Sequence, residues 1–137
     1  MKVAIAVDNR MGTGFNHRRL SRDRELLQDL LTFSDAGVLR VSPYSEKLLA
    51  GYGIPCQASP DYLNLADRED LCFAELDPLL PYEEKIDTLI LYRWLRDYPY
   101  DQVLDLDLSH FSLTERKEFA GSSHEKLVRE VYVHEQK

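Results

Sequence analysis

Val3-Ala4-Ile5-Ala6-Val7, followed by Asp8-Asn9 and then by Gly12-Thr13-Gly14-Phe15-Asn16-His17-Arg18-Arg19-Leu20-Ser21-Arg22-Asp23, is the stretch around which the chain is organised. The uninterrupted apolar run predicts a strand buried on both faces at the centre of a sheet. Gly12 and Gly14 permit the unusual backbone angles of a tight loop. The loop leads into a helix, for which Ser21 is the expected N-cap. Leucines at helical spacing mark the buried face of this helix: Leu26, Leu27, Leu30 and Leu31.

Strand and helix signals alternate through the first half of the chain. Ser42-Pro43 combines a cap with a proline at the first helical position, which predicts the start of a helix. The expected elements are a strand at 38–41, a helix at 44–50, a helical turn ending at residue 65 and a strand at 71–74. This alternation with short links is typical of an α/β sheet with parallel strands at its centre.

The last third of the sequence changes character. Runs rich in strand-forming residues occupy 86–95, 111–119 and 127–133, and no helix signal separates them. We therefore expect these strands to pair antiparallel, as meanders, at one edge of the sheet. The predicted fold is a three-layer α/β domain over residues 1–137, with parallel strands first and antiparallel strands at the C-terminal edge.

Length and charge limit the classes of function. A chain of 137 residues with 44% apolar and 30% charged residues is typical of a single folded domain. Its net charge of −7 argues against extended binding of nucleic acid. Five of the 17 basic residues nevertheless fall close together in sequence: Arg10, Arg18, Arg19, Arg22 and Arg24. A local basic patch on an acidic body suits a small anionic ligand.

Other partners are less well supported by the sequence. Cys56 and Cys72 lack metal-ligand spacing, and no secretory signal precedes them, so we expect reduced thiols in a cytoplasmic protein. No apolar run approaches the length that crosses a bilayer. Asp101, Asp105 and Asp107 belong to no glycine-containing calcium loop, so no metal site is expected. The sequence does not predict an oligomeric state.

The order of elements resembles that of the dihydrofolate reductases. The resemblance lies in Ala6-Val7-Asp8, the glycine loop, the helix that follows with an acidic residue in its first turn, and the helix start at Ser42-Pro43-Tyr44-Ser45. It continues in the layout of the C-terminal part, at residues 86–91, 105–107, 119, 122–124 and 130–132. It implies a dihydrofolate reductase-like fold across most of the chain, and it would align Asp23 with the catalytic acid of those enzymes.

The resemblance implies less about cofactor and activity. The reductases place a glycine pair after a central strand, where the cofactor pyrophosphate approaches the backbone. The matching position here reads Glu75-Leu76-Asp77-Pro78, and Arg18 and Arg19 replace the proline and tryptophan of the reductase substrate loop. No cofactor and no folate chemistry are therefore expected.

Two strings also resemble a family of short bacterial proteins often labelled ribonuclease Z. These are Phe15-Asn16-His17-Arg18-Arg19 with Ser21 and Asp23, and Phe119-Ala120-Gly121-Ser122-Ser123-His124-Glu125-Lys126. Ribonuclease Z of the metallo-β-lactamase type needs a dense His-x-His-x-Asp-His motif. The histidines of this chain stand singly, so its residues do not predict that metal-dependent chemistry.

The glycine loop and its arginines are the predicted binding site. Backbone N–H groups and guanidinium groups converging ahead of a helix can hold a phosphate. The expected ligand-binding residues are Gly12, Gly14, Asn16, Arg18, Arg19 and Arg22, joined by Ser122 and Ser123 from the loop before the last strand. The alternative is a solvated loop whose arginines pair with the acidic body.

A catalytic role would need His17, His124 and Asp23. If the loop before the last strand lies beside the glycine loop, the two imidazoles could act as general base and general acid on a phosphodiester. The alternative is a hairpin turn with His124 exposed. The sequence favours a protein that binds a phosphate-bearing or other anionic ligand, such as a nucleotide. A ribonuclease-type hydrolase and a non-enzymatic protein-interaction module stay open as alternatives.

Overall fold

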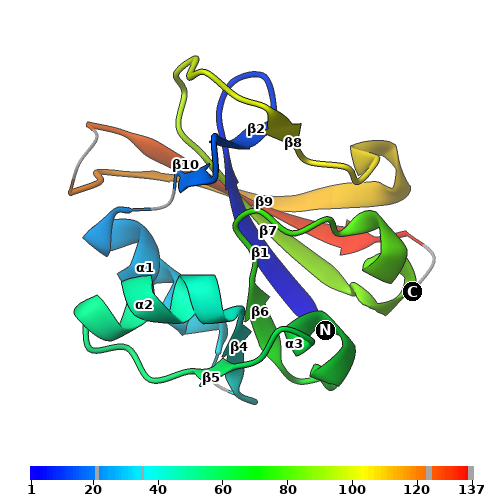
Figure 1. Ribbon diagram of the computed structural model, residues 1–137. Coiled ribbons are helices and arrows are strands. Elements are labelled where there is room, and N and C mark those ends of the chain that lie inside the picture. Colours follow the sequence, from blue (N-terminus) through cyan, green and yellow to red (C-terminus); the bar gives the residue numbers. More distant parts are fainter. Residues whose placement is uncertain (21, 35, 123–124, 136–137) are drawn as a thin grey trace.

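A computed structural model describes residues 1–20, 22–34, 36–122 and 125–135 of the chain. Its main feature is a seven-stranded mixed sheet in the order β5-β4-β6-β1-β7-β10-β9, with helices on both faces (Figure 1). The strands are β1 (Lys2–Val7), β4 (Leu39–Val41), β5 (Gln57–Ala58), β6 (Leu71–Phe73), β7 (Thr88–Arg93), β9 (Phe111–Phe119) and β10 (Leu127–His134). The predicted fold class, with parallel strands first and antiparallel strands at the C-terminal edge, is confirmed.

Strand β1 is the central strand, as its apolar run predicts. It pairs in parallel with β6 on one side and with β7 on the other. Every residue from Val3 to Val7 is buried. Successive side chains of a strand point to opposite faces, so β1 supplies two cores. Ala4 and Ala6 face one of them, and Val3, Ile5 and Val7 face the other.

The helices form the two outer layers. Helices α1 (Arg24–Leu30) and α2 (Pro43–Gly51) cover the face of the sheet to which Ala4 points. Helix α3 (Tyr62–Leu65) and the 3-10 helix η2 (Leu80–Lys85) lie on the opposite face. Short 3-10 turns also occur at η1 (Leu31–Phe33) and η3 (Leu108–His110). Ser42 caps α2 as predicted. Asp23, and not the predicted Ser21, is the residue that caps α1; Ser21 lies outside the described residues.

The C-terminal strands are antiparallel, but they do not form the expected meander. Strand β10, the last in the sequence, lies between β7 and β9 and pairs antiparallel with both. Strand β9 therefore forms the edge, and its residues from Ser112 to Glu118 are exposed. Charged side chains along such an edge discourage pairing with another chain.

The glycine stretch is a β-hairpin, which the sequence analysis did not anticipate. Strands β2 (Gly12–Phe15) and β3 (Arg18–Arg19) form a second sheet with β8 (Gln102–Val103), beyond the end of β1 (Figure 1). Asp8, which directly follows β1, fixes this position. Its carboxylate accepts the N–H groups of Arg10 and Gly12 through Oδ1 and that of Tyr98 through Oδ2.

Gly12 and Gly14 do not supply the unusual backbone angles that the sequence analysis expects of them. Neither has a positive φ. A Cβ at Gly12 would lie 2.7 Å from Cβ of Tyr100, and one at Gly14 would lie 2.3 Å from Cδ2 of Leu76. Close packing, and not backbone angle, therefore requires glycine here. Within the hairpin, Asn16 and His17 are left-handed, with φ of 53° and 60°, and form the two-residue turn between β2 and β3; Met11, just before β2, is left-handed as well, with φ of 64°.

Candidate functional site

The tip of the hairpin is exposed but anchored. Asn16 N–H donates to Oδ2 of Asp101 (3.0 Å), and the hydroxyl of Tyr44, on α2, donates to the carbonyl oxygen of His17 (3.0 Å). The side chains of Asn16, His17 and Arg18 are exposed. Within the described ranges, none of these three side chains forms a hydrogen bond or an ion pair. The tip therefore presents an imidazole and a guanidinium directly to solvent.

Arg19, the next residue, is engaged with an internal carboxylate. Its Nε lies 2.9 Å from Oε2 of Glu75, and the hydroxyl of Ser45 donates to Oε1 of Glu75 (2.8 Å). The guanidinium also donates to the carbonyl oxygen of Tyr44 (3.2 Å) and lies 4.3 Å from the centre of its ring. The Glu75 side chain is only 1% exposed. The carboxylate of Glu75 thus occupies the position between Ser45, in the first turn of α2, and Arg19, where an external anion could otherwise bind.

Asp23 has a structural role at the start of α1. Its Oδ1 accepts the N–H groups of Glu25 (2.9 Å), Leu26 (3.1 Å) and Ser122 (3.1 Å). In return, the hydroxyl of Ser122 accepts the N–H of Arg24 (2.8 Å). The loop before β10 therefore lies against the start of α1. These interactions occupy the N–H groups of the first turn, so the helix start offers them to no ligand.

The predicted site residues divide between these positions. The hairpin brings Gly12, Gly14, Asn16, His17, Arg18 and Arg19 together, whereas Ser122 meets Asp23 at the start of α1. Arg22 is exposed beside the Asp23 cap. Ser123 and His124 lie outside the described residues, so the suggested pairing of His17 with His124 stays a prediction.

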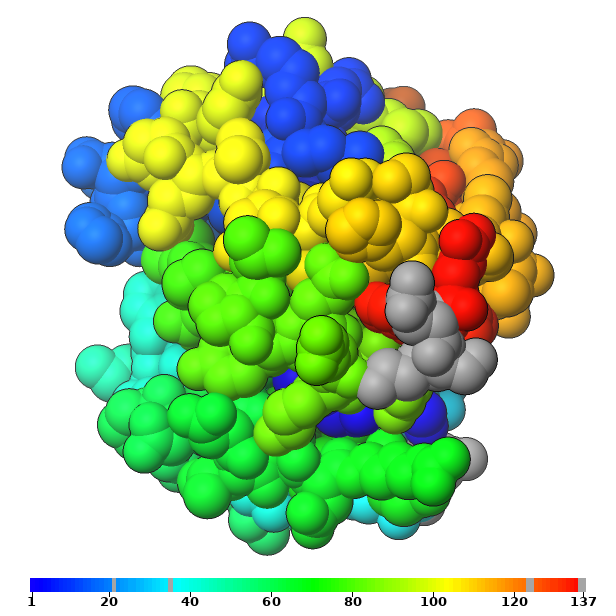
Figure 2. Space-filling model, turned by 90° about the vertical axis from the view of Figure 1, so that its right-hand side faces the viewer, coloured from blue at the N-terminus to red at the C-terminus, as the bar shows by residue number. Residues whose placement is uncertain are grey.

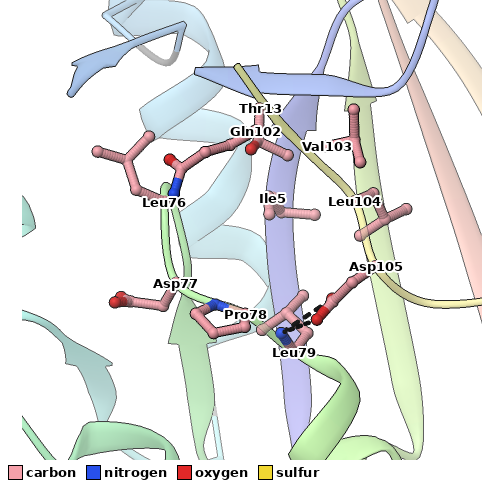
Figure 3. A pocket seen from close by; sticks show the side chains of 10 residues that line it. All are labelled: Ile5, Thr13, Leu76, Asp77, Pro78, Leu79, Gln102, Val103, Leu104 and Asp105. Carbon is pink, nitrogen blue, oxygen red and sulfur yellow. Dashed lines mark hydrogen bonds between the residues drawn. The ribbon is translucent and has the colours of Figure 1, made fainter. Parts of the chain in front are cut away.

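A cavity of about 210 Å³ lies beneath the hairpin, between β1, β2, β8 and the turn that joins β6 to η2 (Figure 3). Its lining is mainly apolar and consists of Ile5, Thr13, Leu76, Asp77, Pro78, Leu79, Gln102, Val103, Leu104 and Asp105. Only Thr13 belongs to the predicted binding stretch, Gly12–Asp23, and Ile5 belongs to the apolar run before it. The other residues come from segments far apart in the sequence, and no local pattern indicates that they meet.

The two carboxylates of this cavity are used by the protein itself. Asp105 accepts the N–H groups of Leu79 (2.9 Å) and Leu80 (3.0 Å). Asp77 accepts the hydroxyl of Tyr62 (2.7 Å). Burial, together with the hydrogen bond to Asp77, raises the pKa of Tyr62, so this hydroxyl keeps its proton. Both acids therefore stabilise the turn after β6 and the start of η2.

Other kinds of site find little support in the described part of the chain. No group of three or more His, Cys, Asp or Glu side chains is placed there to hold a metal ion. None of the helices described is long and apolar enough to span a bilayer. Both cysteines are free thiols, and burial raises the pKa of Cys72 to about 12, which makes that thiol unreactive.

Comparison with known proteins supports the fold and assigns no family. No family model and no curated protein matches the chain. The resemblance to proteins labelled ribonuclease Z therefore stays a prediction. A solved structure of dihydrofolate reductase from Enterococcus faecalis, complexed with NADP(H) and RAB-propyl, is similar with a TM-score of 0.68. The match has 12% sequence identity and covers 98% of this chain and 96% of that one, so the chain has a dihydrofolate reductase-like fold.

Proposed function

We propose that this chain, on its dihydrofolate reductase-like fold, is a small-ligand binding protein that recognises a phosphate-bearing or other anionic ligand through the Gly12–Asp23 stretch. The observation that supports it is the exposed tip of the hairpin. His17 and Arg18 contact no carboxylate among the described residues, although the chain carries a net charge of −7. A guanidinium left free on an acidic body attracts anions.

The anchoring of the tip favours binding further. A turn held by Tyr44 and Asp101 loses little conformational freedom when a ligand binds, so less of the interaction energy is spent on ordering it. A phosphate could accept hydrogen bonds from the guanidinium of Arg18 and from the side-chain amide of Asn16. Arg19 would take part only if the ligand displaced Glu75 from it.

The same residues give no specific support to catalysis. Asp23 is buried and accepts three backbone N–H groups, so it is not positioned as a base or an acid for a bound ligand. The His17 side chain forms no hydrogen bond, within the described ranges, that would orient its ring. We therefore propose a binding protein, and not a hydrolase.

The turn after β6 is a poor fit for a nicotinamide cofactor. A cofactor pyrophosphate needs N–H donors and close approach to the backbone. Here the carboxylate of Glu75 already lies beside the first turn of α2, where it accepts hydrogen bonds from Ser45 and Arg19. We expect titration with NADPH, followed by fluorescence, to show no saturable signal below the millimolar range. Micromolar binding would contradict this expectation.

Titration with pyrophosphate, followed by the backbone amide signals of the chain in NMR spectra, tests the anion proposal. We expect saturable shifts confined to the hairpin and to Tyr44. Replacing Arg18 by Gln should weaken binding about fivefold, or ~1 kcal/mol, the upper range for an exposed charge pair.

The matched control is Arg68→Gln. Arg68 is also an exposed arginine, but it lies beside Met1, at the opposite end of β1 from the hairpin. If both variants weaken pyrophosphate binding equally, the loss of affinity follows from the net charge of the chain alone, and a site at the hairpin is rejected. Absence of saturable shifts at the hairpin would reject the proposal itself.

A further inference from the structure

We propose that the cavity of Figure 3 binds an uncharged, ring-sized ligand that turns an amide- or lactam-like edge towards Thr13 and Gln102. This site goes beyond the anion proposal and does not depend on it, because the cavity lies beneath the hairpin and the exposed side chains of His17 and Arg18 lie at its tip.

A β-bulge directs Thr13 into the cavity. The pairing of β2 with β8 changes register between Gly12 and Gly14, which leaves Thr13 as the extra residue. A bulge of this kind re-aims the side chain of the extra residue. Thr13 is only 5% exposed, and Figure 3 shows it beside Gln102 on the wall formed by the small sheet.

The polar groups of Thr13 and Gln102 have no partner in the described structure. Among the described residues, neither the hydroxyl of Thr13 nor the side-chain amide of Gln102 forms a hydrogen bond. A ligand that bonds to both groups would make hydrogen bonds that the described residues do not supply. An amide and a hydroxyl together offer donors and acceptors side by side, which matches the paired donor and acceptor of a lactam edge.

The volume of the cavity sets the size of the ligand. An apolar cavity of about 150 Å³ accommodates benzene. The present cavity, at about 210 Å³, leaves room for a six-membered ring with its polar substituents. The walls that such a ring would contact are apolar: Ile5, Pro78, Leu79 and Leu104.

The charges around the cavity favour a neutral ligand. Asp77 and Asp105 both line it, which disfavours an anion. A cation would gain little, because Asp105 already accepts two backbone N–H groups. Asp77 accepts the Tyr62 hydroxyl, and Figure 3 shows its carboxylate pointing away from the cavity. An uncharged ring is the class that satisfies the apolar walls and the two free polar groups together.

Three probes of similar size test this inference: uracil, which carries a lactam edge, toluene, which has no polar edge, and benzoate, which is anionic. Each is titrated into the full chain, and binding is followed by the NMR signals of Leu79 and Leu104 methyl groups. We expect uracil to bind most tightly, toluene more weakly, and benzoate not to shift these signals at millimolar concentration.

Replacing Thr13 by Val removes the hydroxyl while it keeps the shape of the side chain. We expect Thr13→Val and Gln102→Leu each to weaken uracil binding about threefold to tenfold, the effect of one lost hydrogen bond. Neither change should weaken toluene binding. Gln102 is half-buried, so its variant tests the inference even if Thr13→Val fails to fold.

The matched controls are Thr88→Val, at the start of β7, and Gln57→Leu, on the far edge strand β5; neither residue lines the cavity. The inference is overturned if uracil does not shift the cavity signals, if benzoate binds as well as uracil, or if the controls weaken uracil binding as much as the cavity variants do. Because pyrophosphate binding at the hairpin is measured separately, either proposal can fail without the other.

Discussion

Breaking the ion pair between Arg19 and Glu75 should destabilise the fold substantially. The two side chains are 12% and 1% exposed, so water can compensate little for a lost partner. Removing one member of a buried pair costs about 3–5 kcal/mol. Ser45 would still donate to Glu75, which places the expected loss for Arg19→Met near the lower end, at about 3 kcal/mol. Methionine also removes the guanidinium that lies over the Tyr44 ring.

Urea unfolding of the purified variants measures this effect. In thermal unfolding, the same loss of about 3 kcal/mol should lower the melting temperature by roughly 10 °C in a chain of this size. The Glu75→Gln variant should lose less, about 1–2 kcal/mol, because the amide still accepts hydrogen bonds from Arg19 and Ser45.

The double variant distinguishes a real pair from two independent effects. Arg19→Met combined with Glu75→Gln should cost less than the sum of the single changes by at least about 1 kcal/mol. Arg68→Met, at an exposed position, is the control and should change the free energy of unfolding by less than about 0.5 kcal/mol. If Arg19→Met costs under about 1 kcal/mol, or if the two changes add, Glu75 is not held as an internal anion and the reasoning fails.

Three further predictions concern packing, pH and thiol access. Gly14→Ala should destabilise the protein by about 1–3 kcal/mol in urea unfolding, because its Cβ would overlap a neighbouring side chain and the carbonyl oxygen of residue 18; an unchanged midpoint would contradict this. Burial alone would raise the pKa of Asp70, but hydrogen bonds from Arg40 and from two backbone N–H groups outweigh it and lower that pKa. The resulting stabilisation is present above the ordinary carboxyl pKa and is lost as pH falls through the lowered pKa of Asp70. The difference in free energy of unfolding between wild type and Arg40→Gln should therefore shrink in acid, and a constant difference would refute the assignment. A thiol reagent at pH 8, followed by mass spectrometry, should label Cys56 before Cys72, and Cys72 only after unfolding; labelling of both in the native protein would contradict its burial.

The sequence predicted those elements whose signals are local. The apolar run of β1, the leucines of α1 and the Ser42-Pro43 start of α2 each carry their information within a few residues. Strand order is different, because it depends on pairing between distant segments. The sequence indicates β9 and β10 as strands but contains no local pattern that places β10 beside β7.

The candidate site shows the same division. The basic cluster was visible in the sequence, and Asn16 at the tip is a recognised signal for a residue with positive φ in a two-residue turn. The partner of Arg19 was not visible, because Glu75 lies 56 positions away. The cavity was also hidden, since β1, β2, β8 and the turn after β6 meet only in the folded chain.

The position of β10 between β7 and β9 has a consequence for the order of events during synthesis. As the chain leaves the ribosome, β7 and β9 emerge before the strand that joins them. Until Leu127–His134 is available, β7 has one open edge and β9 has no partner in the main sheet. The nascent chain can assemble β1, β4, β6 and β7 early, but the completed sheet must wait for its last strand. The exposed, charged sequence of β9 keeps this waiting segment in water rather than in contact with other unfinished chains.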